Sequence, residues 1–179
     1  MSKSMLDSEI VQAIRSDANR GFGLLLAKYK EPVYWHIRRV VVRHDDAQDA
    51  TQEAFVRIYR SFGGYDDSKP LSAWVYRIAT NEALRMVQRR QAQATVDLDA
   101  ANCEGLFADE WVDYGDVEAV RLQKAILALP AKQQLAFNMR YYDELSYHEI
   151  AEVLQTSETS VRMNYNIAKQ KIINYFKQL

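Results

Sequence analysis

Cationic, amide and aromatic side chains are interleaved between positions 74 and 88, a combination that suits single-stranded nucleic acid. The set is Trp74, Tyr76, Arg77, Thr80, Asn81, Arg85 and Gln88. Aromatic faces stack on unpaired bases, while cations follow the phosphates of the strand. The segment therefore predicts a surface that binds and threads a single strand, although Trp74 and Tyr76 fit a plain hydrophobic core equally well.

Acidic side chains form a second pattern earlier in the chain. Asp46, Asp49 and Glu53 recur at i, i+3 and i+7, so on a helix they share one face. A rigid acidic face is typical of a surface that docks onto a basic partner. We predict that all three carboxylates are exposed.

The third pattern predicts a helix-turn-helix between about Ser146 and Phe176. Ser146 and Glu149 match a capping box, and Ser157 is a second cap candidate. Apolar residues of the second helix recur at steps of four, three, four and four, so we expect them inside: Val161, Tyr165, Ala168, Ile172 and Phe176. Polar residues and one methionine are left outside: Thr159, Arg162, Met163, Asn166 and Lys169. Such a helix fits the roughly 12 Å wide major groove of DNA. The alternative is a helical hairpin that merely packs, and Gln155 stands where many such turns have glycine.

A metal-dependent hydrolase is another reading of the same chain. The segment Arg43-His44-Asp45-Asp46 contains the His-Asp pair that all-helical metal phosphohydrolases use, and His36 and Asp49 could complete a ligand set. The chain has three histidines in all, and the third lies inside the capping box. We therefore predict no metal site, no catalytic residues, no cofactor and no small-molecule substrate.

The elements that must position these groups are predicted to be helices throughout, an all-α fold. Glycine and proline are scarce, and apolar residues recur at helical spacing. The expected helices are a short one capped by Asp7 or Ser8, a long one over about 22–41 that kinks or breaks at Pro32, one from Asp45 or Asp46 to about 62, and one over 71–90. A loop over 63–70 precedes the last of these. Further on we expect helices over about 117–127 and from Pro130 onward, followed by the helix-turn-helix.

Charge divides the chain into three parts. The net charge of the 179 residues is -1, yet residues 91–120 hold eight acidic side chains and no basic one. We predict two small helical domains, 1–92 and 118–179, joined by a flexible acidic linker over 93–117. The linker charge suits mimicry of nucleic acid and a plain connector equally well. The single Cys103, the absence of an apolar leader and the lack of a long apolar run favour a reduced, cytoplasmic setting.

Three stretches of this sequence resemble the extracytoplasmic-function (ECF) class of bacterial sigma factors, within the sigma-70 family. They are the segment 46–59 that begins Asp-Ala-Gln-Asp-Ala, the segment 72–81 that reads Ser-Ala-Trp-Val-Tyr-Arg-Ile-Ala-Thr-Asn, and Ala-Leu-Pro at 128–130 leading to 146–154. The resemblance covers most of residues 8–92 and 118–176. It implies an alternative sigma factor that binds core RNA polymerase and directs promoter-specific transcription initiation.

The resemblance also implies roles for individual residues. The first domain would bind the polymerase beta-prime clamp helices through Asp46, Asp49, Gln52 and Glu53, with Phe55 in the core beneath them. It would hold the melted minus-ten element through Tyr65, Lys69, Trp74, Tyr76, Arg77, Asn81 and Arg85, and offset the cost of flipping a base with a pocket. The second domain would read the minus-thirty-five element as duplex through Ser157, Thr159, Ser160, Arg162, Met163, Asn166 and Lys169.

The recognition helix departs from the pattern of the family. Met163 and Asn164 stand where a serine-arginine pair is common, and Asn166 and Ile167 replace positions that are often aromatic and basic. We therefore expect a distinct minus-thirty-five preference, with Asn166 reading an adenine and Met163 contacting a thymine methyl group.

The implied partners are core polymerase, including its beta flap, promoter DNA and an anti-sigma factor, often membrane-anchored. The alternative is a helix-turn-helix regulator that acts alone on duplex DNA and dimerises through its first domain. The two hypotheses differ in whether polymerase is needed.

Overall fold

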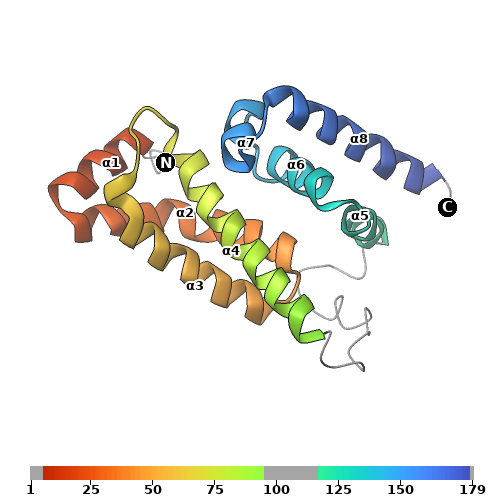
Figure 1. Cartoon of the computed structure of the whole chain (residues 1–179), viewed down its shortest axis with the longest axis horizontal. Coiled ribbons are helices and arrows are strands. Elements are labelled where there is room, and N and C mark those ends of the chain that lie inside the picture. The colour runs from red at the N-terminus through yellow and green to blue at the C-terminus, as the bar shows by residue number, and fades with distance from the viewer. Residues whose placement is uncertain (1–5, 95–116, 178–179) are drawn as a thin grey trace.

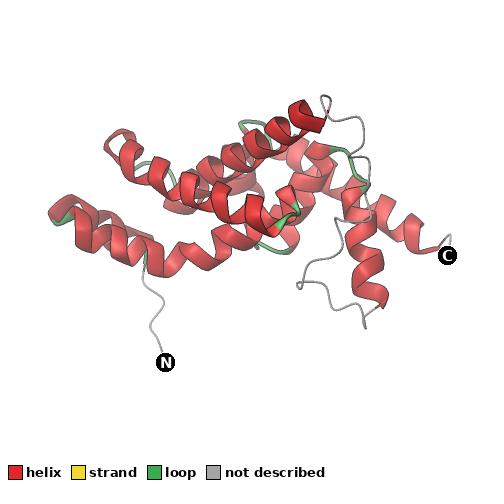
Figure 2. Ribbon diagram, turned by 90° about the horizontal axis from the view of Figure 1, so that it is seen from below, coloured by secondary structure: helices red, strands yellow, loops and turns green. Residues whose placement is uncertain are grey.

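The computed structural model describes residues 6–94 and 117–177, and the part of the chain that it describes contains helices and no strand (Figures 1 and 2). The α-helices are α1 (Asp7–Ser16), α2 (Ala18–Val41), α3 (His44–Ser61), α4 (Leu71–Ala94), α5 (Val117–Leu127), α6 (Ala131–Tyr141), α7 (Tyr147–Leu154) and α8 (Glu158–Lys177), with a 3-10 turn η1 (Phe62–Gly64). The all-α expectation is confirmed. The predicted linker 93–117 lies almost wholly outside the described residues.

Helices α1 to α4 form the first domain around a core of aliphatic side chains. Leu25, Val33 and Ile37 of α2 are fully buried against α3 and α4. Gly21 allows α2 to cross α1 closely, because a Cβ there would lie 2.2 Å from the backbone nitrogen of Ile14. Pro32 lies inside α2, and the helix continues through it. Of the kink or break expected at this proline, the break is therefore wrong.

Two helix ends of the first domain differ from expectation. Helix α1 starts after Leu6, whose amide donates to the Glu9 carboxylate at 2.9 Å. Asp7 instead accepts hydrogen bonds from Tyr29 and Lys28 of α2, so it ties two helices together rather than capping one. Helix α4 runs to Ala94, four residues past its predicted end.

Helices α5 to α8 form the second domain. Pro130 is the N-cap of α6, as its place in the sequence predicted. Ile126, Phe137 and Ile172 make a small core between α5, α6 and α8. Phe176, which was expected to point inward, is 36% exposed because α8 extends beyond the helices that cover it.

The two domains pack against one another, with α7 contacting α4 and α6 contacting α2 (Figure 1). Met139, Ile150 and Val153 of the second domain join the same buried cluster as Leu25 and Val33 of the first. The domains thus share a continuous apolar core. None of the described helices is both long and apolar enough to cross a membrane.

Candidate nucleic-acid interface

Serine side chains cap the start of both helices of the motif, α7 and α8. Ser146 accepts a hydrogen bond from the Glu149 amide, and the Glu149 carboxylate accepts from the Ser146 amide at 2.9 Å, which confirms the predicted capping box. Ser157 accepts from the Ser160 amide and caps α8. Gln155 closes α7 in the left-handed region, with φ 51° and ψ 50°. A non-glycine residue thus makes the turn that glycine makes in many such motifs.

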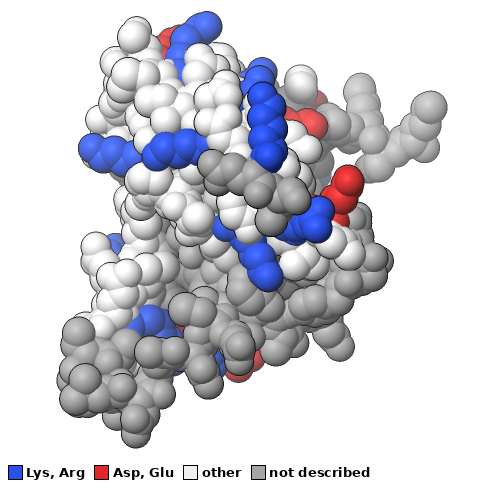
Figure 3. Space-filling model, turned by 90° about the vertical axis from the view of Figure 1, so that its right-hand side faces the viewer, with Lys and Arg blue, Asp and Glu red and all other residues white. Residues whose placement is uncertain are grey.

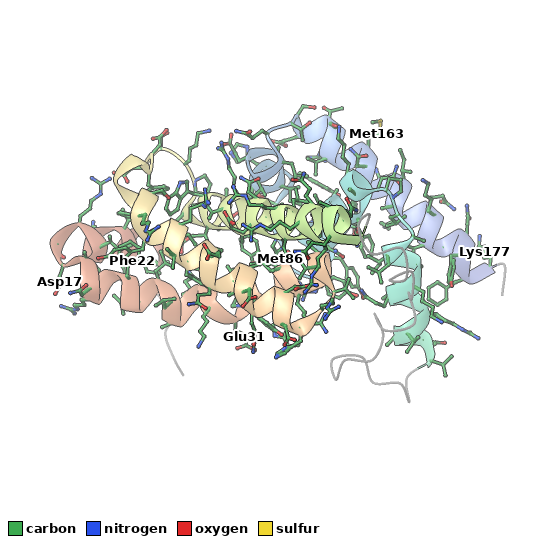
Figure 4. All side chains as sticks on the ribbon, turned by 60° about the horizontal axis from the view of Figure 1, so that its bottom comes forward. Asp17, Phe22, Glu31, Met86, Met163 and Lys177 are labelled. Carbon is green, nitrogen blue, oxygen red and sulfur yellow. The ribbon has the colours of Figure 1, made fainter. Side chains whose placement is uncertain are left out.

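The outer face of α8 carries the side chains that the sequence predicted to face outward. Five are exposed: Thr159, Arg162, Met163, Asn166 and Lys169. The Met163 side chain is 56% exposed and lies on the outer side of the helix (Figure 4). Val161 and Ala168 face inward and fix the rotation of α8.

Two cations on α8 rest on aromatic rings. The Arg162 guanidinium lies 4.6 Å from the ring centroid of Tyr147, and the Lys169 ammonium lies 5.7 Å from that of Tyr165. Figure 3 views the end of the molecule where α5 and α8 lie, and there lysine and arginine outnumber acidic side chains among the described residues. The Ser157 hydroxyl is engaged in the cap of α8, where it accepts from the backbone amide of Ser160, so the start of this helix is what Ser157 offers to a phosphate.

The predicted single-strand surface on α4 is reduced by burial. Tyr76 is 5% exposed, its ring lies edge-on to His36, and burial raises its pKa above the usual range. In this arrangement Tyr76 is therefore a core residue, the alternative that the sequence left open, because its side of α4 faces α2. Asn81 is exposed and Arg77 half-buried. Arg85 contacts the buried Glu82 at 3.0 Å, which Arg57 also contacts, so it is held in an ion-paired network.

An aromatic cluster orders the loop before α4. Tyr65 stacks on Phe62 at 5.6 Å and lies 5.3 Å from Trp74, between ring centroids. The Tyr65 hydroxyl donates to the Lys69 carbonyl at 2.6 Å. Asp66 accepts from the Ser68 amide, and this hydrogen bond lowers the pKa of its carboxyl group. The loop is therefore a preformed turn beside the half-buried Trp74.

Helix α7 covers part of this surface. Lys69 forms an ion pair with Glu152 at 2.5 Å, and Ser72 donates to Glu149 at 2.6 Å. A small cleft is lined by Lys69, Ala73, Trp74, Arg77 and Glu152. In this arrangement the helix-turn-helix domain lies on the candidate single-strand surface.

The acidic face of α3 is smaller than predicted. Asp49, Gln52 and Glu53 are exposed, but Asp46 is 4% exposed and accepts two hydrogen bonds from Arg90 of α4. The expectation that Asp46 is exposed is wrong, because the acidic arc lies at the edge where α4 crosses α3. Asp46 joins the two helices instead.

An apolar groove beside this acidic face was not anticipated. It has a volume of about 880 Å³ and lies between α2 and α3, with Gln52 and Phe55 in its wall. Leu26, Val56 and Tyr59 are exposed there by 40%, 38% and 53%. In the sequence, the signal for this groove is the presence of apolar residues at positions outside the inward-facing periodicity of each helix.

The proposed metal ligands are not brought together. His44 contacts the Tyr34 hydroxyl at 2.7 Å, His36 contacts Asp143 and Thr80, and Asp46 is bound by Arg90. Among the residues that the structure describes, no group of three or more histidine, cysteine or acidic side chains could hold a metal ion. The hydrolase hypothesis thus receives no structural support.

Two family models match the chain: sigma-70 region 2 over residues 25–93 and sigma-70 region 4 over residues 119–172. The RNA polymerase sigma-H factor of Pseudomonas aeruginosa is 31% identical over 176 residues, covering 93% of this chain and 91% of that protein. The ECF RNA polymerase sigma factor SigW of Bacillus subtilis is 28% identical, covering 98% of each.

A solved structure has the same fold. The sigma factor RpoE of Bartonella quintana, in co-crystal with the anti-sigma factor NepR, superposes with a TM-score of 0.71 at 19% identity, covering 87% of this chain and 96% of that one.

Proposed function

This chain belongs to the sigma-70 family, in the ECF class of RNA polymerase sigma factors, and from that membership we propose which of its surfaces contact polymerase and promoter DNA. The protein is an alternative sigma factor that directs promoter-specific transcription initiation. One observation carries this function: regions 2 and 4 match the two helical domains in the expected order. The stand-alone regulator is not favoured, because its first domain would have no reason to match region 2.

The outer face of α8 reads the minus-thirty-five duplex. Arg162 and Lys169 are long cations held over aromatic rings at the edge of the face, which suits phosphate contacts. Asn166 and Met163 lie between them, fully available to base edges. An amide pairs with adenine N6 and N7, and an apolar side chain contacts the thymine methyl group.

The η1–α4 turn and the exposed side of α4 hold the melted minus-ten strand. Trp74 and Tyr65 present aromatic surface, while Lys69, Arg77 and Asn81 provide cations and an amide beside it. Tyr76 and Arg85 stabilise α4 from within rather than touching DNA. The single strand therefore follows the same surface that α7 now covers.

The exposed carboxylates and amide of α3 dock onto polymerase. Asp49, Gln52 and Glu53 face solvent beside the apolar groove, so a basic helical partner meets charge and apolar area together. The Asp46–Arg90 pair fixes the position of α3 against α4. We assign this surface to the beta-prime clamp helices, and we assign the beta-flap contact to the second domain.

An anti-sigma factor is a further proposed partner. The Bartonella quintana structure holds a sigma factor of this fold with an anti-sigma factor. In this chain the groove between α2 and α3 exposes Leu26, Val56 and Tyr59, an apolar area that suits a masking partner. We further propose a cytoplasmic protein whose partner is membrane-anchored, and a non-catalytic specificity subunit without cofactor or metal.

In vitro transcription tests the function directly. The purified chain is added to core RNA polymerase on a fragmented genomic template, and the 5′ ends of the transcripts are sequenced. We expect discrete start sites with two shared upstream elements, and weak duplex binding by the chain alone. Tight sequence-specific duplex binding without polymerase, combined with no new start sites, would support the stand-alone regulator instead.

A further inference from the structure

A histidine is buried at the contact between the two domains. His36 lies on α2, is 0% exposed, and contacts groups from two other parts of the fold. Its Nδ1 lies 2.6 Å from Asp143 Oδ2, in the turn between α6 and α7 of the second domain. Its Nε2 lies 2.9 Å from Thr80 Oγ1 on α4. The side chain therefore joins both domains through a single ring.

The hydrogen bonds of Thr80 determine whether Nε2 of His36 carries a proton. A threonine hydroxyl has one proton. In Thr80 that proton lies between Oγ1 and the Tyr76 carbonyl oxygen, which are 2.7 Å apart, because two bare oxygen lone pairs repel at that distance. The hydroxyl therefore accepts from the imidazole, and His36 Nε2 is an N–H donor.

The contact with Asp143 requires a second proton. An ionised carboxylate accepts hydrogen bonds only. Arg39, a permanent cation, donates to the other oxygen of Asp143 at 2.9 Å. The 2.6 Å contact with His36 Nδ1 therefore needs a proton on the nitrogen, and the ring with protons on both nitrogens is an imidazolium. If the carboxyl group held this proton instead, the closed pair would still bind one proton more than the separated groups.

The surrounding groups do not titrate in its place. Burial raises the pKa values of Tyr76 and Tyr142, so both phenols stay neutral near pH 7. Arg39 is always charged and lies 4.4 Å from the Tyr142 ring centroid. Exposed carboxyl groups in general titrate about two pH units below imidazole. The charged and titratable groups that face the site are Arg39, Glu31, Tyr76, Tyr142, Asp143 and Glu144.

The closed arrangement cannot read a promoter. The minus-ten and minus-thirty-five elements lie about 25 base pairs apart, which is roughly 80 Å at 3.4 Å per pair. Here α7 packs directly on α4 (Figure 1). Lys69 donates to Glu152, and Ser72 donates to Glu149. The domains must separate before both elements can be bound, which removes Asp143 from His36.

We propose that His36 and Asp143 form a proton-linked latch that holds the protein closed, so that acidification favours the closed, DNA-excluding form and alkalinisation favours the open one. In the open form His36 keeps its Nε2–H bond to Thr80, while Nδ1 faces water and no longer needs a proton to meet a carboxylate. The consequence for transcription rests on the proposed function, whereas the pH-dependent contact between the two domains does not.

The direction and size of the pH effect on the open-to-closed ratio follow from proton linkage. The closed form holds one proton more than the open form, by the count of hydrogen-bond donors and acceptors above. The form that binds the extra proton is favoured as the pH falls, so the open-to-closed ratio rises with pH, by at most about tenfold per pH unit for one proton.

Energy transfer between two dyes on the full chain tests the latch without polymerase or DNA. Cys103 is replaced by serine, and dyes are attached at Asn19→Cys on α2 and Lys171→Cys on α8, both exposed sites. We expect the transfer efficiency to change between pH 6.0 and 8.0, and the change to vanish in His36→Gln. A signal that stays flat in the parent chain, or a response that survives in His36→Gln, overturns the latch.

Matched substitutions complete the test. His44→Gln and His148→Gln replace the other two histidines of the chain, and both should keep the parent pH response. Asp143→Asn removes the partner from the other domain and should abolish the response as His36→Gln does, so it decides the question if His36→Gln does not fold. Loss of the response in the His44 or His148 variant instead would move the titrating group away from the latch. Absence of transcription with an intact pH response would count against the proposed function alone.

Discussion

At the scale of single residues, the outer face of α8 combines two kinds of side chain that suit different DNA contacts. Asn166 has an amide whose donor and acceptor match one edge of adenine, whereas Lys169 is a point charge that binds any phosphate. Both side chains are exposed and lie one turn of helix apart. Their removal should therefore have different effects on promoter choice.

We predict that Asn166→Ala loses preference at one base pair of the minus-thirty-five element. A bidentate amide–adenine pair contributes about 1–3 kcal/mol of discrimination, so initiation on the preferred sequence should fall roughly tenfold or more. Lys169→Ala should weaken all sequences by a similar factor. The measurement is initiation from a library randomised in that element. Asn174→Ala, on the same helix, is the control, and an unchanged base profile in Asn166→Ala would refute the assignment.

On α3, Asp46 is buried against Arg90, whereas Asp49 and Glu53 are exposed. Substitutions at these positions should therefore have different effects. Asp49→Ala combined with Glu53→Ala removes two exposed charges and should reduce core-polymerase affinity by about tenfold with little change in thermal stability. Asp46→Ala removes the partner of Arg90 and should cost about 1–2 kcal/mol of folding free energy. Titration with core enzyme and thermal unfolding measure the two effects. Asp45→Ala is the exposed control, and unchanged polymerase affinity in the double variant would move the docking surface elsewhere.

At the scale of elements, the α7–α8 turn holds a side chain in an unfavourable backbone region. Gln155 has φ 51°, and its amide donates to the Ala151 carbonyl to close α7. Left-handed backbone costs roughly 1–2 kcal/mol for a residue with a Cβ, and glycine avoids most of that cost.

Gln155→Gly should therefore stabilise the second domain. We predict a gain of about 1 kcal/mol, or an increase of a few degrees in the unfolding midpoint, measured by calorimetry. Gln155→Ala keeps a Cβ in the same backbone region and should gain little. Equal midpoints for the glycine and alanine variants would show that the turn is not strained.

At the scale of the whole molecule, the packing of α7 on α4 covers the surface that we propose for the minus-ten strand. The shared core, the Lys69–Glu152 ion pair and the Ser72–Glu149 hydrogen bond all lie along this contact. Lys69, a proposed minus-ten contact, is thus paired with a protein side chain in the closed form. We therefore expect that the domains must separate before initiation.

Holding the domains together should block initiation. In a Cys103→Ser background, Ser72→Cys and Glu149→Cys are joined by a short bismaleimide whose spacer contains a disulfide. These side chains touch at 2.6 Å in the closed form, so the crosslink should form within one chain. We expect transcription with core polymerase to fall at least tenfold and to recover when a reductant cleaves the spacer. The same double variant without crosslinker is the control, and full activity of the crosslinked protein would mean that opening is unnecessary.

Much of this protein is determined by local sequence. The Ser146–Glu149 capping box, the helical spacing of apolar residues and the motifs of 46–59 and 72–81 are short-range features, so they predicted the helices, the helix-turn-helix and the family. The outward face of α8 also followed, because Val161 and Ala168 fix its rotation whatever packs behind them.

Tertiary structure decided what depends on a neighbour distant in the chain. Asp46 is buried because Arg90 reaches it from 44 positions away, and Tyr76 is buried because its side of α4 meets α2. His36 contacts Asp143 across 107 positions. Periodicity gives the face of a helix on which a residue lies but not the partner that covers that face, so the domain contact and its buried histidine were visible only in three dimensions.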